Sequence, residues 1–236
     1  MNERLNERPD ERSDERLDEQ TRARWARLSS TNVSDALDAL GLPGAAAGIR
    51  PLSESWRKLV GPAVTVQLTA AGADVPPTHL GMKAVAAARP GDVIVVANSG
   101  PPEASCWGGI LANAAAVRGV AGTVIDGCCR DLDDCREADY PVFAKGTAVR
   151  TARGRVVEES TGYPVVCGGA EVCPGDLVLG DSSGVVFVPR AALERVLAKA
   201  EELYAREEAM LARIRAGEDI LAVDAAFSYN TMLQRE

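Results

Sequence analysis

The chain has 236 residues, a net charge of −8 and a sequence pI near 4.9. This balance argues against a nucleic-acid-binding surface, which needs a basic patch, and no apolar run reaches the roughly 18 residues of a membrane-spanning helix. The charged start lacks the apolar stretch of a signal peptide, so we expect a cytoplasmic protein with no membrane partner. Because only 4% of the residues are aromatic, the core must be built from aliphatic side chains.

The first twenty residues differ from the rest of the chain. Residues 1–20 repeat Asn-Glu-Arg and Asp-Glu-Arg triplets and hold few large aliphatic side chains. Such a segment buries too little apolar surface to offset its ordering entropy. We therefore predict a disordered or frayed charged tail at 1–20 and a single domain at 21–236.

Helices and strands alternate through the first half of the chain. Ser30-Thr31-Asn32 offers N-caps to a helix that ends before Gly41-Leu42-Pro43. Alternating Val and Thr predict a strand with one buried face. The expected elements are a helix ending at Leu40, a strand at 60–69, a helix at 79–88, a strand at 92–97 and a helix of small residues at 104–118.

A charged pair follows the next strand. Residues 122–125 form a short buried-strand pattern, and a polar tip leads to Arg130 and Asp131. Ligands bind at such strand ends in α/β proteins. Arg130 can grip a carboxylate with two parallel hydrogen bonds, and Asp131 can hold a hard divalent cation. The alternative is a surface ion pair worth at most about 1 kcal/mol, and the two residues alone leave both readings open.

A second anion-binding element precedes this pair. Trp107-Gly108-Gly109 lies near the start of the helix expected at 104–118. Glycines there let a ligand approach backbone N–H groups, and a helix N-terminus favours an anion. Because glycine pairs are common, this signal is weak by itself.

The second half ends in a hairpin and a long helix. We expect a short helix at 133–138, a strand at 141–144, strand-like pieces at 156–157 and 163–167, a hairpin of 177–179 with 185–188, and a long helix at 190–216. His79 is the only histidine, which leaves one candidate for any histidine-based site. The six cysteines form no zinc pattern and are expected to be reduced thiols.

Several motifs together resemble one family. They are Asn32-Val-Ser-Asp-Ala-Leu-Asp-Ala-Leu-Gly41, Pro90-Gly-Asp-Val-Ile-Val-Val96, Trp107-Gly108, Gly119-Val-Ala-Gly-Thr-Val-Ile-Asp-Gly127 with Arg130-Asp131, and Pro174-Gly-Asp-Leu-Val-Leu-Gly-Asp181 with Gly184-Val-Val-Phe-Val-Pro189. In this order and spacing they are similar to the RraA-like family of class II pyruvate aldolases, typified by 4-hydroxy-4-methyl-2-oxoglutarate aldolase. The resemblance runs from about Thr31 to Ala216.

The resemblance implies a fold, an activity and a site. The fold would be a compact α/β sandwich of the β/β/α swivelling-domain kind, here with a long C-terminal helix, assembled as homotrimers or hexamers. Such proteins are Mg²⁺- or Mn²⁺-dependent lyases that cleave 4-hydroxy-2-oxo acids to pyruvate, and many decarboxylate oxaloacetate. Carried over, Asp131 is the metal ligand and Arg130 binds the small 2-oxo acid substrate. The backbone that holds pyruvate matches Gly108, Gly109, Ile110 and Leu111.

One departure and two alternatives accompany this resemblance. Family aldolases often carry an acid where this chain has Gly109, which puts the usual substrate in doubt, and Glu103 nearby could substitute. Some relatives are non-catalytic regulators that bind ribonuclease E and lack the catalytic Asp, so the presence of Arg130 and Asp131 favours an enzyme. A methyltransferase is disfavoured because no GxGxxG loop follows a strand.

Overall fold

The computed structural model describes residues 17–52, 57–72 and 80–227. Residues 1–16 of the predicted tail, and His79, lie outside the described residues. The helices are α1 (Glu19–Arg27), α2 (Ser30–Ala39), α3 (Met82–Ala87), α4 (Gly109–Val117), α5 (Leu132–Glu137), α6 (Leu193–Arg215) and α7 (Ile220–Phe227). The strands are β1 (Arg50–Pro51), β2 (Leu59–Ala70), β3 (Val93–Asn98), β4 (Ser105–Trp107), β5 (Gly122–Cys129), β6 (Val142–Thr147), β7 (Val156–Thr161), β8 (Val165–Cys167), β9 (Ala170–Val172), β10 (Leu177–Asp181) and β11 (Gly184–Val188).

One large mixed sheet organises the chain, with strand order β1-β6-β5-β3-β2-β10-β11. Its centre, β6-β5-β3-β2, is parallel. The central strands are buried on both faces, as parallel strands usually are: Ile94 and Val96 of β3 face one cluster, and Val93 and Val95 face another. An antiparallel bridge joins Ala45, which precedes β1, to Val186 of β11, so the sheet is nearly closed.

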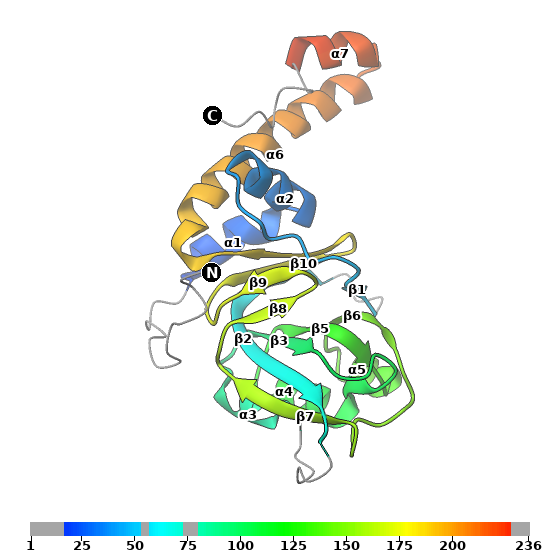
Figure 1. The fold of residues 1–236 in the computed structure, drawn as a ribbon. Helices are drawn as coiled ribbons and strands as arrows, with labels where there is room; N and C mark the ends of the chain where they lie inside the picture. The colour runs from blue at the N-terminus through cyan, green and yellow to red at the C-terminus, as the bar shows by residue number, and fades with distance from the viewer. Residues whose placement is uncertain (1–16, 53–56, 73–79, 228–236) are drawn as a thin grey trace.

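The helices form two groups around this sheet (Figure 1). α1, α2 and α6 gather over β10 and β11, where Trp25, Leu37 and Leu197 are buried in one cluster. α3, α4 and α5 lie around the other end of the molecule. α6 runs away from the body and carries α7 at its far end. The structure thus confirms the expected mixed α/β fold with a long C-terminal helix, and no described helix is long and apolar enough to cross a membrane.

The structure corrects the prediction of one helix over 104–118. Ser105–Trp107 is instead the strand β4, which pairs in parallel with the end of β5. Gly108 has extended backbone angles, and α4 begins at Gly109. The three residues are buried, and pairing with β5 satisfies their backbone groups better than a helix without a cap would.

Other predicted boundaries move as well, among them those of β5 and α2. β5 continues beyond the predicted 122–125 to Cys129, because β4 and β6 both pair with its second half. The cap of α2 is Ser29, not one of the three residues predicted, and it forms a capping box with Asn32.

The cysteines are reduced thiols, as predicted. All six lie in the described part of the chain, and none forms a disulfide. Five are buried and Cys128 is half-buried. They contribute packing rather than cross-links.

Asp181 ties α2 to the β10–β11 hairpin, which predicts a pH-dependent stability. Its carboxylate accepts from the Ser30 N–H and hydroxyl, each at 2.7 Å, and from the Ser183 N–H at 2.9 Å. Burial alone would raise the pKa of Asp181, but these hydrogen bonds hold it below its usual value. Because the folded pKa is the lower one, the stabilisation is present above about pH 4 and is lost as the pH falls through the lowered value.

We therefore expect Asp181→Asn to lower the free energy of unfolding by about 1–3 kcal/mol at pH 7. Urea unfolding at pH 7 and near pH 3 should show this difference shrinking in acid. Glu208→Gln, at an exposed position of α6, is the matched control and should change neither value. An equal loss of unfolding free energy at both pH values would show that the charge of Asp181 does not contribute to stability.

Candidate active site

The end of β5 delivers Arg130 and Asp131 together. The Arg130 N–H donates to the Trp107 carbonyl at 3.0 Å, which ties this turn to β4. Asp131 then adopts a left-handed conformation, with φ of 54°. This region is uncommon for residues other than glycine and costs conformational energy. Asp131 precedes α5 without capping it, so its carboxylate is available elsewhere.

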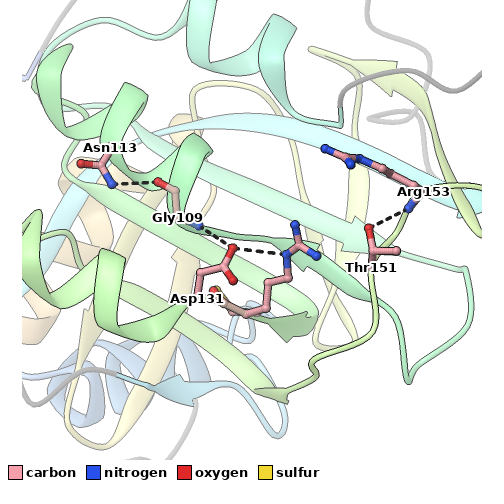
Figure 2. Close-up of polar contacts among 7 residues, drawn as sticks. Gly109, Asn113, Asp131, Thr151 and Arg153 are labelled. Carbon is pink, nitrogen blue, oxygen red and sulfur yellow. Dashed lines mark hydrogen bonds and ion pairs between the residues drawn. The ribbon is translucent and has the colours of Figure 1, made fainter.

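That carboxylate faces the start of α4 (Figure 2). Asp131 Oδ2 accepts from the Gly109 N–H at 3.3 Å and lies 3.2 Å from Arg130 Nε. The side chains of Arg130 and Asp131 are 34% and 40% exposed, so both remain accessible to a ligand. The predicted pair and the predicted helix start therefore meet in space.

Gly108 makes this approach possible. A Cβ at Gly108 would lie 2.8 Å from Asp131 Oδ2 and 3.2 Å from Arg130 Cγ, so a side chain there would require the side chain of Asp131 to shift. The Gly109 carbonyl, in turn, accepts from Asn113 Nδ2 at 2.9 Å within α4. Gly108 thus permits the close approach of Arg130 and Asp131 to the start of α4.

A cavity of about 720 Å³ opens beside these residues. The predicted site residues that line it are Gly108, Ile110, Leu111, Arg130 and Asp131. Its volume lies within the range typical of small-molecule sites. A second cavity of about 700 Å³, between α1 and the start of α6, contains none of them.

The sequence missed the opposite wall of the cavity. Residues 151–154 lie there, at the start of the turn formed by residues 153–155. Among the described residues, Arg153 is the only charged lining residue besides Arg130 and Asp131. The Arg153 N–H donates to Thr151 Oγ1 at 3.3 Å (Figure 2). The only signal was irregular sequence rich in Arg and Thr, which does not specify a site.

Glu103 is not part of this cavity. It pairs with Arg150 at 3.2 Å, and both side chains are more than half exposed. The expectation that Glu103 could replace the acid absent at Gly109 is therefore not supported by its position.

The donor set constrains which metal could bind. Among the described residues no three His, Cys, Asp or Glu side chains gather as a metal site. The described residues therefore form no closed four-ligand site of the kind that binds structural zinc. Mg²⁺, in contrast, is commonly held by one or two carboxylates together with ligand oxygens and water. A half-exposed Asp131 at a cavity fits such an ion.

The fold and the candidate site together define a mixed α/β protein with a cavity of small-molecule size at the end of a parallel strand. The model of RraA-like proteins, described as Aldolase/RraA, matches residues 30–187, and the chain belongs to this family.

Three related proteins show how far the similarity extends. A protein of Halalkalibacterium halodurans, provisionally named 4-hydroxy-4-methyl-2-oxoglutarate aldolase, is 36% identical over 77% of this chain and 82% of its own length. Protein DlpA of Legionella pneumophila is 31% identical over 80% of this chain, but the match spans only 31% of DlpA. The solved structure of Streptomyces coelicolor RraAS2, described as an unusual member of the RNase ES inhibitor RraA protein family, is similar with a TM-score of 0.73. It is 29% identical, and the match covers 82% of this chain and 96% of that one.

Proposed function

We propose that the protein is a divalent-metal-dependent lyase that cleaves 4-hydroxy-2-oxo acids to pyruvate, decarboxylates oxaloacetate, or does both. The observation that carries the proposal is the meeting of Arg130, Asp131 and the start of α4 at one wall of a cavity of small-molecule size. The name of the Halalkalibacterium relative supports the same chemistry.

The chemical problem is the charge left by bond cleavage. Breaking the carbon–carbon bond, or losing CO₂ from oxaloacetate, leaves the enolate of pyruvate. A bound Mg²⁺ or Mn²⁺ would supply Lewis-acid stabilisation of that charge. Asp131 is the residue that would hold the ion.

The other groups bind and orient the substrate. The Arg130 guanidinium would form charge-assisted hydrogen bonds with the carboxylate of the pyruvate half, and it is preorganised by its contact with Asp131. The first N–H groups of a helix have no partner within the helix. The N–H of Gly109 donates to Asp131, so the N–H groups of Ile110 and Leu111 would be the ones that bind the anion. Leu80 and Trp107 add apolar walls that limit water.

A covalent imine route is disfavoured by the position of the lysines. No lysine lines the cavity within the described chain. Lys145 pairs with Asp126, and Lys58 donates to the carbonyls of Ala26 and Leu28. A Schiff base requires an amine that reaches the substrate carbonyl.

The test is pyruvate release from oxaloacetate and from 4-hydroxy-4-methyl-2-oxoglutarate, with Mg²⁺ and then with excess chelator. We expect release that the chelator removes and that added Mg²⁺ restores. The ratio of the two rates would rank lyase against decarboxylase activity. Absence of release from both substrates, with folded protein and metal present, would contradict this proposal for these substrates.

A regulatory role is the second candidate function. It is favoured by the description of Streptomyces RraAS2 as a member of an RNase inhibitor family. Inhibition of a ribonuclease by this chain, unaffected by Asp131→Asn and without pyruvate release, would support the regulator. We also propose a homo-oligomer, a trimer or a hexamer, which light scattering on the purified protein would measure.

A further inference from the structure

Glu158 of β7 carries a buried carboxylate that the proposed chemistry does not use. Its side chain is only 4% exposed. Oε2 accepts from the Gly81 N–H at 2.8 Å, and Oε1 accepts from the Thr161 hydroxyl at 2.7 Å. Lys83 Nζ lies 3.7 Å from Oε1. Because burial of a carboxylate is costly unless it is hydrogen-bonded, these contacts hold the side chain in one place.

An irregularity in β7 aims this carboxylate. Ser160 and Glu158 pair with consecutive residues of β2, so Glu159 between them has no partner in the ladder. Such a bulge inserts one extra residue and re-aims the neighbouring side chains. It brings Glu158 and Thr161 into contact, although side chains three residues apart in a regular strand point to opposite faces. The strand therefore holds its own carboxylate in position.

Gly81 lies between this carboxylate and one wall of the cavity. It precedes α3 and has a left-handed backbone, with φ of 73°. A Cβ at Gly81 would lie 2.9 Å from Trp107 Cζ3 and 3.6 Å from Leu111 Cδ1, so the glycine packs against both side chains. Trp107 and Leu111 line the cavity, as does Leu80, the residue that precedes this glycine. The hydrogen bond from Gly81 to Glu158 thus fixes an apolar wall of the cavity.

We propose that Glu158 is a positioning residue for substrate binding, which acts by holding Gly81 against Trp107. Leu111, which Gly81 also contacts, lies in the first turn of α4, whose N–H groups would bind the substrate carboxylate. β7 itself lines the same cavity, so one carboxylate joins two of its walls. This inference rests on the proposed function, because it needs a substrate in this cavity.

The first test is the KM for pyruvate release in Glu158→Leu, which removes both hydrogen-bond acceptors. The Gly81 N–H then loses its partner, and the wall is free to shift. We expect KM to rise about 10-fold, since small displacements far from the chemistry can cost up to about 100-fold in rate. Mn²⁺ affinity without substrate should stay at the wild-type value. A residue that only stabilises the fold would leave the KM of the folded protein unchanged.

Two variants are the controls for this test. Glu158→Gln keeps an acceptor for the Gly81 N–H and should keep KM close to the wild-type value. Glu159→Leu makes the same change at the exposed neighbouring residue and should leave KM unchanged. Urea unfolding of each variant verifies the fold. If Glu158→Leu does not fold, Thr161→Val removes only the hydroxyl that orients the carboxylate and should raise KM by a smaller factor.

Fluorine NMR of protein labelled with 5-fluorotryptophan tests the contact independently of activity. The fluorine is attached to Cζ3, the atom of Trp107 that lies nearest to a Cβ at Gly81. The chain has three tryptophans, and Trp107→Phe identifies the resonance of Trp107. We expect this resonance to shift in Glu158→Leu and to stay in place in Glu158→Gln and Glu159→Leu.

The outcomes separate this inference from the proposed function. A Trp107 resonance that does not move in Glu158→Leu would overturn the contact and the inference with it. Wild-type KM in a Glu158→Leu protein whose resonance has moved would overturn the role of Glu158 in substrate binding. Absence of pyruvate release by the wild-type protein would overturn the proposed function and this role together, while the resonance would still show whether Glu158 holds the wall.

Discussion

Replacing Asp131 with asparagine should lower kcat/KM for metal-dependent pyruvate release by about 10³-fold, which corresponds to about 4 kcal/mol of transition-state stabilisation. Asparagine tolerates the left-handed conformation found at this position and can still accept from the Gly109 N–H. The variant therefore isolates the negative charge. Steady-state rates across a range of Mg²⁺ concentrations measure the effect.

The control for this prediction lies on the same helix. Asp133→Asn removes an equal charge from an exposed ion pair and should keep wild-type kcat/KM. Asp131→Ala should lose turnover as Asp131→Asn does, while far-UV circular dichroism stays unchanged. Normal Mg²⁺-dependent turnover in Asp131→Asn would show that Asp131 does not hold the metal.

Replacing Arg130 with lysine should lower kcat/KM by about 10²-fold, in the range seen when one preorganised donor is removed from a site of developing charge. Lysine keeps the charge but lacks the planar fork that binds a carboxylate through two hydrogen bonds. Arg130→Ala should lose at least as much. Separate kcat and KM values for both substrates measure how the loss is divided between binding and turnover.

A specific role for Arg130 also predicts what should not change. Mn²⁺ affinity without substrate should stay close to wild type in Arg130→Lys, because the metal is assigned to Asp131. Arg136→Lys, at an exposed position of α5, is the matched control and should leave kinetics unchanged. Full activity of both Arg130 variants would remove this residue from the site.

The local residue pattern was sufficient to predict much of the fold. Pro174-Gly-Asp176 and the apolar runs beyond it predict the β10–β11 hairpin, which the structure confirms. Buried runs of Val and Ile likewise predict β3, and the spacing of apolar residues predicts α6 within three residues at its start. In each case the sequence and the tertiary packing favour the same structure.

β4 and the far wall of the cavity depend on distant partners. Ser105–Trp107 forms a strand because it pairs with the end of β5. The alanine-rich segment that follows favours a helix, so the local sequence does not predict this strand. Arg153 reaches the cavity because β7 pairs with β2 and holds residues 151–154 against the site. Neither contact leaves a signal in the local residue pattern.

The residue pattern likewise predicted only part of the candidate site. Arg130, Asp131 and the glycine pair could be selected from the sequence because their chemistry is recognisable and their neighbours match family motifs. Asp134 could not, because an acid in the first turn of a short polar helix is ordinarily solvated, yet its side chain lies against Gly109 at the start of α4. Only its packing against Gly109 distinguishes it from Asp133.

The central claim is that Asp131 and Arg130 stabilise the enolate of pyruvate with a divalent cation, and exchange of the methyl protons of pyruvate in D₂O tests it without knowledge of the natural substrate. Proton NMR should show the methyl signal of pyruvate decaying faster with enzyme and Mg²⁺ than with buffer and Mg²⁺. The decay should return to the buffer rate with excess chelator, and also in Asp131→Asn. Exchange at the buffer rate with folded, Mg²⁺-supplied wild-type protein, or exchange that persists in Asp131→Asn, would contradict the account.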